Sequence, residues 1–470
     1  MKIVFCSSEV FPFVKTGGLA DVGGALPLAL EQAGIEVMIF LPLYKAIDRS
    51  KFNITQVSAT VSTTKIGTAI DVYFIENEKY FSRDGIYGDS HGDYPDNLDR
   101  FQFFSEQVLE FLRASHIKVD LIHCHDWQTA LIPVYLKEKY CNNPVFENTK
   151  SLLTIHNMAY QGVFSKKEYV KIKLKEELFG VNGFEFFGQI NLLKAGILYA
   201  DVLTTVSPQY AKEIQAKEFG CGLDGVIRSR KTEVVGILNG IDGTIWNPQT
   251  DALLEYRYGP ADAMAIKPKN KTYLQQRLDL PVRPDVPLLG FVARLTHQKG
   301  IDLLLEAIDD LVDLDLQIII QGVGESKYHA ILNTIDMRYP KDVAVCLAFD
   351  EKIAHQIYVG CDLFLMPSLF EPCGLSQMIS LRYGTIPIVY KTGGLADSIK
   401  PFSPRHLDGN GFLFERYKKD NFVDAVKKAI DLYHDHETFS TLINNAFHSQ
   451  FGWEQSAQKY IKAYQCLLSV

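Results

Sequence analysis

Lys15-Thr16-Gly17-Gly18-Leu19-Ala20-Asp21 and Lys391-Thr392-Gly393-Gly394-Leu395-Ala396-Asp397 are two copies of one heptapeptide, near the two ends of the chain. Each copy follows a short apolar segment and precedes an amphipathic one, so each predicts a strand, a glycine turn and a helix. Backbone N–H groups in such a turn can bind a phosphate or a sugar hydroxyl, and glycine lets the ligand approach closely. Two copies at equivalent places in two similar domains predict a ligand held in a cleft between the domains. The alternative is that a favourable helix-starting turn has recurred by chance.

Apolar runs alternate with amphipathic stretches along the whole chain, which is typical of parallel sheets covered by helices and so of the α/β class. The strands predicted in the first half are Lys2–Cys6, Glu36–Leu41, Leu121–His123, Ser151–Thr154 and Val202–Val206. Those predicted in the second half are Pro287–Val292, Leu316–Gln321, Val343–Leu347, Leu363–Pro367 and Ile386–Val389. The segment between the two series is rich in proline and glycine, and we expect the hinge just after Asn239-Gly240.

The composition excludes several classes of protein. A chain of 470 residues, 47% hydrophobic and 22% charged, has room for two or three domains and is typical of a globular protein that folds in water. Its net charge of -8 offers no general cationic surface, so neither nucleic acid nor a membrane is expected as a partner. The 8 cysteines form no CxxC pair, and no export signal or long apolar span is visible, which predicts a cytoplasmic protein.

Two common nucleotide-binding motifs are absent from the sequence. It has no GxGxxG followed by an acidic residue and no GxxxxGK[ST], which argues against an NAD-dependent dehydrogenase and against a P-loop enzyme. The phosphate site that the two heptapeptides predict is therefore of another kind.

Two cations follow the first predicted strand of the second half. Ala293-Arg294-Leu295-Thr296-His297-Gln298-Lys299-Gly300 lies between that strand and a predicted helix, Ile301–Ile308. Open α/β sheets bind ligands at the carboxyl ends of their strands. Arg294 and Lys299 can there stabilise the negative charge that grows on a leaving diphosphate. The alternative is a solvated basic turn.

A carboxylate follows another predicted strand, within Ser368-Leu369-Phe370-Glu371-Pro372-Cys373-Gly374-Leu375. Glu371 in this constrained turn can orient sugar hydroxyls or balance positive charge at an anomeric carbon, although a helix start also favours a carboxylate for its dipole alone. Cys373 can be a nucleophile, but a cysteine with no histidine close in sequence is more often a packing residue.

Polar residues also follow two strands of the first half, in His123-Cys124-His125-Asp126-Trp127-Gln128 and in Thr154–Gly162. The two histidines and Asp126 invite a metal interpretation, but successive residues of a strand point to opposite faces and no HExxH or CxxC partner is present. Hydrogen bonding to a sugar by Asp126 and His156 is the better explanation.

Taken together, these motifs strongly resemble the bacterial glycogen synthase and plant starch synthase family. The motifs that match in the family's order and spacing are KTGGLAD (15–21), HDWQ (125–128), HNMAYQG (156–162), VSPQYAKEI (206–214), LNGID (238–242), RLTHQKG (294–300), FEPCGLSQ (370–377) and TGGLAD (392–397). The resemblance covers essentially the whole chain. It implies the GT-B fold, in which two Rossmann-like domains with parallel sheets face each other across a deep cleft. We therefore expect domains at 1–242 and 243–452, and a C-terminal helix, 453–470, that crosses back to the first domain.

The resemblance also implies the reaction. The family members are retaining glycosyltransferases that move glucose from ADP-glucose to the non-reducing end of an α-1,4-glucan and release ADP. ADP-glucose and the glucan would be the partners, and no cofactor or metal would be needed; the oligomeric state stays open. Closure about the Asn239 region would bring Lys15, Asp126 and His156 onto the sugar and exclude water, which favours transfer over hydrolysis.

Site residues follow from the resemblance position by position. Those implied to be catalytic are Glu371, Lys15, Arg294, Lys299, His156 and Asp126. Those implied to bind the phosphates or glucose through the glycine loops are Gly17, Gly18, Thr392, Gly393 and Gly394. Those implied around the donor glucose and the acceptor are Asp21, Tyr94, Asn157, Asn239, Cys373, Gly374 and Leu375. Phe349 falls where some members place a tyrosine on the adenine face.

One departure and two alternatives remain. Related GT-B transferases carry a second glutamate eight positions after the first, where this chain has Ile379, and Gln377 nearby is usual in this family. A same-fold enzyme that uses UDP-glucose or another acceptor would fit the phosphate loops. A catalytically silent glucan-binding protein would be expected to lose Lys15 or Glu371, and both are present.

Overall fold

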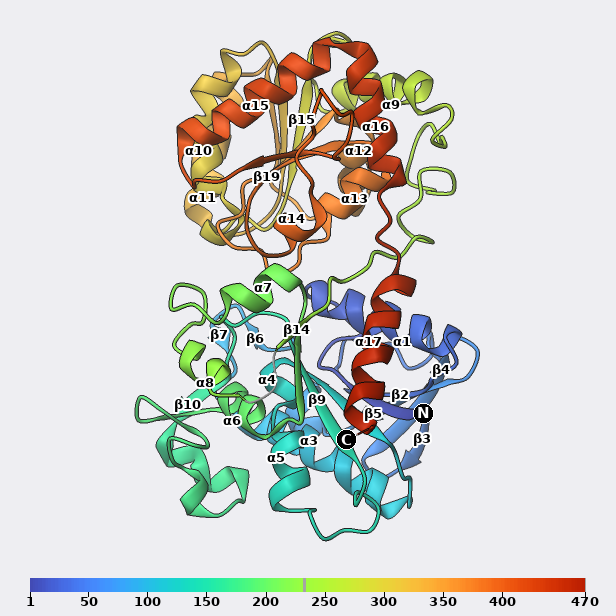
Figure 1. The fold of residues 1–470 in the computed structure, drawn as a ribbon, viewed down its shortest axis with the longest axis vertical. Coiled ribbons are helices and arrows are strands. Elements are labelled where there is room, and N and C mark those ends of the chain that lie inside the picture. Colours follow the sequence, from blue (N-terminus) through green and yellow to red (C-terminus); the bar gives the residue numbers. More distant parts are fainter. Residues whose placement is uncertain (231–233, 470) are drawn as a thin grey trace. The chain divides into compact units, whose positions relative to one another are not determined.

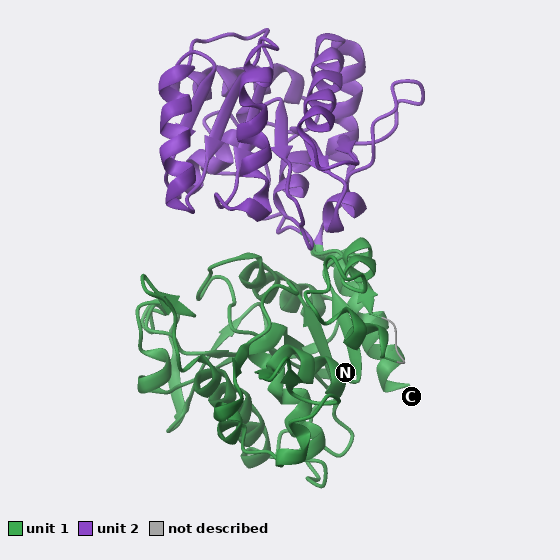
Figure 2. Ribbon diagram, turned by 90° about the vertical axis from the view of Figure 1, so that its left-hand side faces the viewer, with its two compact units in different colours: residues 1–240, 453–470 green, residues 241–452 purple. Residues whose placement is uncertain are grey.

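The computed structural model describes residues 1–230 and 234–469. The chain forms two compact units, shown in different colours in Figure 2. Unit 1 contains residues 1–240 and the segment that starts at Trp453, and unit 2 contains residues 241–452. The last residue of the helix expected at 453–470 lies outside the described residues. The two units are described separately below.

Unit 1 is built on a nine-stranded sheet in the order β14-β13-β9-β8-β1-β2-β5-β4-β3. Its strands are β1 (Lys2–Cys6), β2 (Glu36–Pro42), β3 (Thr55–Ser58), β4 (Val61–Ile66), β5 (Ile70–Ile75), β8 (Leu121–His125), β9 (Lys150–Ile155), β13 (Val202–Thr205) and β14 (Val235–Gly236). The strands from β14 to β5 are parallel, and β4 and β3 are antiparallel additions at one edge. Small sheets outside it are β6 (Gly88–Asp89) with β7 (Gly92–Asp93), and β10 (Val163–Ser165), β11 (Glu185–Phe186) and β12 (Gln189–Asn191).

Helices join and cover these strands (Figure 1). They are α1 (Gly18–Gln32), α2 (Glu78–Phe81), α3 (Asn97–Ala114), α4 (Asp126–Thr129), α5 (Leu131–Glu138), α6 (Leu192–Tyr199), α7 (Pro208–Glu213), α8 (Asp224–Arg228) and α17 (Trp453–Leu468). The central strands β1 and β8 are buried on both faces, as parallel strands between helical layers require, and β1 is a nearly continuous apolar run, whereas β8 also carries two histidines.

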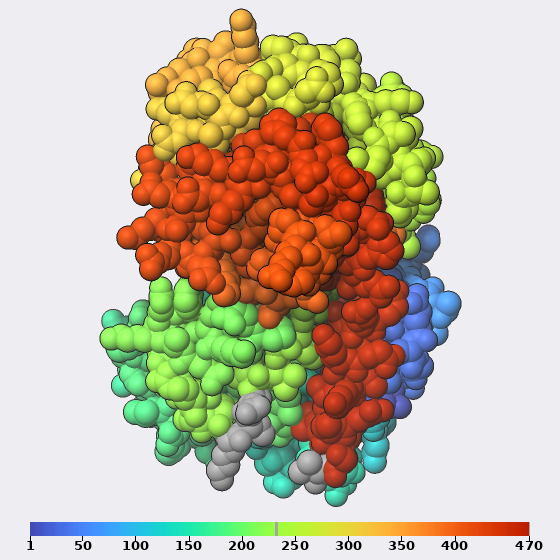
Figure 3. Space-filling model, turned by 45° about the horizontal axis from the view of Figure 1, so that its top comes forward, coloured from blue at the N-terminus to red at the C-terminus, as the bar shows by residue number. Residues whose placement is uncertain are grey.

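The last helix, α17, belongs to unit 1 and contacts α1 (Figures 1 and 3). Its buried side chains recur at helical spacing, and Ser456 Oγ donates a hydrogen bond of 2.6 Å to the Leu238 carbonyl. A Cβ on Gly240 would lie only 2.7 Å from the Trp453 backbone nitrogen, so glycine is needed where the chain leaves unit 1 and later returns to it. The expectation that the C-terminal helix returns to the first domain is confirmed.

Unit 2 has a six-stranded, fully parallel sheet in the order β17-β16-β15-β18-β19-β20. Its strands are β15 (Leu288–Val292), β16 (Gln317–Gln321), β17 (Val343–Cys346), β18 (Leu363–Met366), β19 (Ile386–Tyr390) and β20 (Phe412–Phe414). Its helices are α9 (Ala263–Arg277), α10 (Ile301–Val312), α11 (Ser326–Arg338), α12 (Glu351–Gly360), α13 (Ser376–Arg382), α14 (Gly393–Ser398), α15 (Lys419–His434) and α16 (His436–His448).

Each sheet has one point at which the strand order reverses. In unit 1 the chain first builds outward from β1 to β2 and then returns to the other side of β1 as β8. In unit 2 it builds outward from β15 to β17 and returns to the other side of β15 as β18. Loops diverge at such a switch point, which opens a crevice at the carboxyl ends of the two strands. The two switch points are therefore where each unit can hold a ligand.

The ten predicted strands are all present, with ends that differ by two residues at most. The sequence did not predict β3, β4, β5, β14 and β20 of the two main sheets. The residues of β3 are exposed and mostly polar, and those of β4 are mostly polar, so neither strand shows the apolar run of a central strand. The prediction that the two heptapeptides occupy equivalent places is wrong. The first copy follows β1, at the switch point of unit 1, whereas the second follows β19, one strand away from the switch point of unit 2.

No helix among the described residues is both long enough and apolar enough to cross a membrane.

Candidate active site

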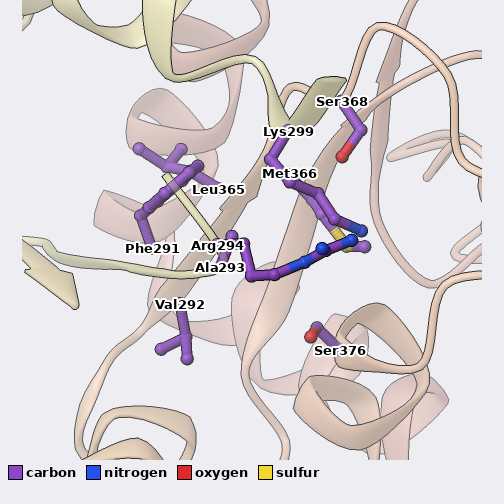
Figure 4. Close-up of a pocket in the computed structure, with 9 residues that line it drawn as sticks. All are labelled: Phe291, Val292, Ala293, Arg294, Lys299, Leu365, Met366, Ser368 and Ser376. Atoms are coloured by element: carbon purple, nitrogen blue, oxygen red, sulfur yellow. The ribbon is translucent and has the colours of Figure 1, made fainter. Parts of the chain in front are cut away.

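The switch point of unit 2 contains a pocket of about 190 Å³. Its lining residues are Phe291, Val292, Ala293, Arg294, Lys299, Leu365, Met366, Ser368 and Ser376. They come from β15, from β18 and from the loops that follow these two strands. In Figure 4 the side chains of Arg294 and Lys299 point in the same direction, with the hydroxyls of Ser368 and Ser376 on either side. The sequence prediction that cations lie at this strand end is therefore met by the geometry.

Glu371 forms an ion pair with Lys299 beside this pocket. The Lys299 ammonium donates to both carboxylate oxygens, at 2.6 and 2.9 Å, and Ser368 Oγ donates to one of them at 3.0 Å. Glu371 is only 5% exposed, and Lys299 and Ser368 hold its carboxylate in place. Residues 72 positions apart in the sequence are thus joined in one charged group.

Arg294 is exposed, and its side chain has no ion pair or hydrogen bond to any described residue. The pocket therefore combines one neutralised cation, Lys299, with one cation that is available to a ligand. A dianionic group such as a diphosphate matches this arrangement, because Arg294 can bind it directly while Lys299 shares its charge with Glu371.

The two loops at this switch point are tied together through their backbones. Leu369 N–H donates to the Gln298 carbonyl at 2.9 Å, and the Gln298 side chain donates back to the Phe370 carbonyl at 3.3 Å. Gly300, with φ 75°, passes so close to Pro367 that a Cβ would lie 1.8 Å from its carbonyl oxygen. Only glycine suits both this backbone conformation and this approach.

The second heptapeptide packs against the backbone of the turn that carries Glu371. Gly394 N–H donates to the Glu371 carbonyl at 3.0 Å. A Cβ on Gly393, whose φ is 42°, would lie 2.0 Å from the same carbonyl oxygen, and a Cβ on Gly394 would lie 2.0 Å from the Cys373 carbonyl oxygen. The backbone of this copy is thus closely packed against the carboxylate-bearing turn.

Other predicted residues of unit 2 have different surroundings. Gln377 is fully buried and donates to the carbonyls of Cys373 and Gly374 at 3.1 and 3.0 Å, so it braces the turn from inside. Ile379 is buried as well. Phe349 lies in the loop between β17 and α12 and is 88% exposed, which leaves its ring free to stack on a base.

In unit 1, Glu9 occupies the first glycine loop. Its carboxylate accepts hydrogen bonds from the backbone N–H groups of Thr16, at 2.5 Å, and of Gly17, at 3.2 Å. Glu9 lies just beyond β1 and is buried, so two N–H groups of this loop already have a partner within the protein. Lys15 in the same loop pairs with Asp21 at 2.6 Å. The sequence had not identified Glu9 as a site residue, although it stands at the end of the switch-point strand.

Two tyrosines of unit 1 have defined partners: Tyr87 bonds Glu9, and Tyr94 packs against two arginines. Tyr87 donates its hydroxyl proton to Glu9 at 2.6 Å. Tyr94, a predicted site residue, accepts a hydrogen bond from Gly85 N–H, and its ring packs against the guanidinium groups of Arg83 and Arg100. Tyr94 is therefore held in place by cation–π contacts.

Asp126 and His156 meet where β8 and β9 end. Asp126 follows β8 with φ 55°, and its carboxylate accepts the His156 backbone N–H at 2.6 Å. Burial raises the pKa of Asp126 to about 7 and lowers the pKa of His156 to about 3. Near neutral pH the His156 ring is neutral, and Asp126 is near the midpoint of its titration.

His123 has partners that explain it without a metal. Its Nδ1 lies 2.8 Å from the Tyr464 hydroxyl of α17, and its Nε2 lies 2.6 Å from Thr154 Oγ1. Burial keeps the pKa of His123 well below its usual range. Within residues 1–230 and 234–469, no group of three or more histidine, cysteine, aspartate or glutamate side chains is arranged to hold a metal ion.

The two asparagines differ in their surroundings. Asn157 follows His156, and its side-chain oxygen accepts the Ala159 N–H at 3.0 Å. Asn239 is buried, and its side-chain oxygen has no hydrogen-bond partner in the described part of the chain. Buried amide oxygens normally have a partner, so the side-chain oxygen of Asn239 is available to accept a hydrogen bond from a ligand or a water molecule.

The structure thus brings the predicted residues together in separate groups. In unit 2 it joins Arg294, Lys299 and Glu371, and in unit 1 it joins Lys15 with Asp21 and Asp126 with His156. Sequence reasoning assigned no site role to Glu9, Tyr87 and Ser368, and it considered His125 only as a metal ligand. Glu9, His125 and Ser368 stand next to a strand end that was predicted, so position at a switch-point strand was the signal that could have found them.

Two switch-point sites on two Rossmann-like sheets, one of them a cationic pocket, define a glycosyltransferase of the GT-B fold. The comparisons agree: residues 2–229 match the family model for the starch synthase catalytic domain, and residues 275–448 match that for glycosyl transferases group 1. A starch synthase IV catalytic domain from Arabidopsis thaliana, solved with ADP and acarbose, superposes with a TM-score of 0.91 at 32% identity, over 100% of this chain and 99% of that one.

Relatives match along the full length. A glycogen synthase from Pseudothermotoga lettingae is 42% identical over 99% of this chain and 98% of its own, and one from Geotalea daltonii is 43% identical over 100% and 99%. The chain belongs to the glycogen synthase and starch synthase family. A sucrose-phosphate synthase from Thermosynechococcus elongatus, 17% identical with a TM-score of 0.63, shares the fold.

Proposed function

We propose that the chain is a glycogen synthase that transfers glucose from ADP-glucose to the non-reducing end of an α-1,4-glucan, with retention of configuration, and releases ADP. Full-length relatives carry the name glycogen synthase, and the solved starch synthase was bound to ADP and to the oligosaccharide acarbose. The free cysteines of the chain suit the reducing cytoplasm, where we propose that it acts.

The charged group of unit 2 is the observation that carries this proposal. Arg294 is free to bind an anion, and Lys299 is held by Glu371 at the edge of the same pocket. Cleavage of the bond between the sugar and the diphosphate leaves negative charge on ADP. Fixed cations that face this charge lower the barrier, because they need no reorganisation as it develops. No metal ion enters this proposal.

Glu371 has a second task in the proposal. Its carboxylate lies beside the cationic pocket, and we propose that it accepts hydrogen bonds from sugar hydroxyls of the donor or balances positive charge at the anomeric carbon. Its pairing with Lys299 fixes the orientation of the carboxylate and of the ammonium. Cys373, Gly374 and Leu375 continue the same turn, and we propose that they line the sugar pocket.

We propose that unit 1 supplies groups that contact the sugar. We propose that Asp126 and His156 contact the sugar hydroxyls of the donor and the acceptor, that Lys15 contacts the donor, and that Tyr94, Asn157 and Asn239 help to position them. A neutral imidazole suits a hydroxyl partner, because it offers one donor and one acceptor. Attack by the acceptor hydroxyl from the face that ADP leaves would retain the configuration of the sugar.

The test measures the release of ADP from ADP-glucose and the release of UDP from UDP-glucose. Each is measured with and without glycogen. The proteins compared are the wild type, Glu371→Ala, and Glu306→Ala as a matched control that removes an exposed glutamate from α10 of the same unit. We expect release that depends on glycogen, favours ADP-glucose and is lost in Glu371→Ala by a factor of about 10² or more.

Three outcomes would contradict the proposal. Equal or better use of UDP-glucose would overturn the donor assignment. Release that does not depend on glycogen would indicate hydrolysis rather than transfer. Normal rates in Glu371→Ala would remove this carboxylate from the reaction, and an equal loss in Glu306→Ala would show that the effect is not specific to the site.

A further inference from the structure

A buried histidine of unit 1, His125, faces a partly buried one, His156, at the carboxyl ends of β8 and β9. His125 is the last residue of β8, and its Nδ1 lies 2.8 Å from Nε2 of His156. The His125 ring is fixed in place, because the rings of Phe5 and His123 both lie against it with centroids 4.1 Å away. No role in the reaction has been given to His125 so far.

Both rings are neutral near pH 7. Burial keeps the pKa of His125 well below its usual range and lowers that of His156 to about 3. A neutral imidazole carries one proton, on either of its nitrogens. The contact between the rings therefore has two possible forms: His125 donates from Nδ1 to His156, or His156 donates from Nε2 to His125.

The other nitrogen of His125 distinguishes the two forms. His125 Nε2 is buried and has no hydrogen-bond partner among residues 1–230 and 234–469. If His156 were the donor, His125 would carry its proton on Nε2, as a buried N–H without an acceptor. If His125 is the donor, the same nitrogen holds only an unused lone pair. Orphaned buried N–H groups are rarer in proteins than underused acceptors, which favours the second form.

We propose that His125 is a positioning residue, which donates its Nδ1 proton to Nε2 of His156 and so keeps the proton of His156 on Nδ1. The Nδ1–H of His156 is then a hydrogen-bond donor on the side of the ring turned away from His125. This inference rests on the proposed function, in which that donor meets a hydroxyl oxygen of the sugar. His125 acts through His156 and does not itself touch the substrate.

The backbone shows why His125 suits this task. Thr129 Oγ1 accepts the His125 N–H at 2.6 Å and donates to the His125 carbonyl at 2.9 Å, which fixes the main chain at the end of β8. With the main chain held by Thr129 and the ring held by Phe5 and His123, Nδ1 has a single direction in which to donate. Fixed second partners of this kind select the tautomer of a functional histidine.

The first test reads the tautomer of His156 directly and does not depend on activity. The full chain is labelled with 15N-histidine, and long-range 1H–15N spectra are recorded at neutral pH. The His156 signals among the 12 histidines are assigned by their loss in His156→Gln. We expect a pyrrole-type shift for His156 Nδ1 and a pyridine-type shift for its Nε2. The reverse pattern would overturn the proposal.

The second test compares two substitutions of His125 that differ in the donor. The side-chain amide of His125→Asn places an N–H close to the position of Nδ1, whereas His125→Leu fills similar space without any donor. We expect His125→Leu to lower kcat by about tenfold or more, with both KM values within about threefold, and His125→Asn to keep kcat within about threefold. Equal losses in the two variants would contradict a positioning role.

The two tests also separate this inference from the proposed function. If the wild type transfers no glucosyl group, the proposed function fails while the spectra still report the tautomer. If His125→Leu does not fold, as its melting curve would show, the spectra of the wild type and the activity of His125→Asn still decide.

Discussion

The two copies of the heptapeptide have identical sequences but different tasks. In unit 1 the loop bonds a side chain, because Gly17 N–H donates to the Glu9 carboxylate. In unit 2 the loop meets a main chain, because Gly394 N–H donates to the carbonyl of Glu371. A Cβ on Gly17 would meet nothing within 4 Å, whereas a Cβ on Gly393 would lie 2.0 Å from the Glu371 carbonyl oxygen. Packing therefore requires glycine at position 393 but not at position 17.

The same contrast extends to the two switch points. Unit 2 presents charges there, with Arg294 exposed beside the pair of Lys299 and Glu371. Unit 1 has the ion pair of Lys15 with Asp21 in the loop after β1, but where β8 and β9 end it presents His156, whose ring burial keeps neutral near pH 7. A diphosphate needs the first kind of site, and sugar hydroxyls are served by the second. In the proposed function, the charged group of unit 2 binds the diphosphate and the residues around His156 in unit 1 contact the sugar.

The largest expected effect is that of Gly393→Ala. The new Cβ would overlap the Glu371 carbonyl oxygen, and alanine would have to adopt φ 42°. Strain and overlap together should destabilise unit 2 by about 3 kcal/mol or more and displace the Glu371 turn. We expect transferase activity to fall by a factor of about 10³, measured with ADP-glucose and glycogen, together with a clear fall in the melting temperature.

Gly17→Ala is the matched substitution in the other copy. Gly17 has φ -156°, which any residue adopts, so we expect the melting temperature to stay within about 1 °C of the wild type. If a ligand needs the open space above Gly17, the KM for ADP-glucose rises while the melting temperature stays constant. Equal destabilisation by Gly17→Ala and Gly393→Ala would show that the two loops are not different.

The next effect in size is that of Arg294→Ala. Removing the exposed cation takes away a fixed partner of the departing diphosphate, and we expect kcat/KM to fall by about 10²–10³ with little change in melting temperature. Arg294→Lys keeps the charge but not the planar fork, so it should recover only part of the activity. Arg338→Ala removes another exposed arginine of unit 2 and serves as the control. A near-normal rate in Arg294→Ala would exclude this residue from the site.

The sequence predicted the fold better than it predicted the site. Central strands such as β16, whose Ile318, Ile319 and Ile320 are fully buried, are continuous apolar runs that stand out in any sequence. Strand β4 reads Val-Ser-Thr-Thr-Lys-Ile, with only Val61 and Ser62 buried, so its place between β3 and β5 depends on its neighbours and not on its own composition.

The site shows the same limit more sharply. The local sequence around Gly17 and Gly393 is identical, so no local reasoning can assign Glu9 as the partner of one loop and the Glu371 carbonyl as the partner of the other. Glu9 lies only eight positions before Gly17, outside the repeated heptapeptide, whereas the Glu371 carbonyl is brought to Gly393 by the adjacency of β18 and β19. Lys299 and Glu371 were both predicted, yet their direct pairing also follows only from the adjacency of β15 and β18.

The smallest expected effect concerns pH and tests the neutral character of unit 1. Burial raises the pKa of Asp126 to about 7 in the folded chain, whereas an unfolded aspartate loses its proton near pH 4. Between these values the unfolded state binds fewer protons than the folded state, so the wild type loses stability as the pH rises from about 4 to about 7, and no more above that. Asp126→Asn removes this loss, since its amide cannot ionise.

The measurement is the melting temperature of the wild type and of Asp126→Asn at pH about 5 and about 8. Relative to the variant, the wild type should lose on the order of 2 kcal/mol between the two pH values, which is several degrees for a unit of this size. Asp93→Asn, which changes an exposed carboxylate of the same unit, should follow the wild type. Parallel curves for the wild type and Asp126→Asn would mean that Asp126 is fully ionised in the fold. The end of β8 would then carry a charge, and the contrast between the two switch points would rest on the Lys299 pair and Arg294 alone.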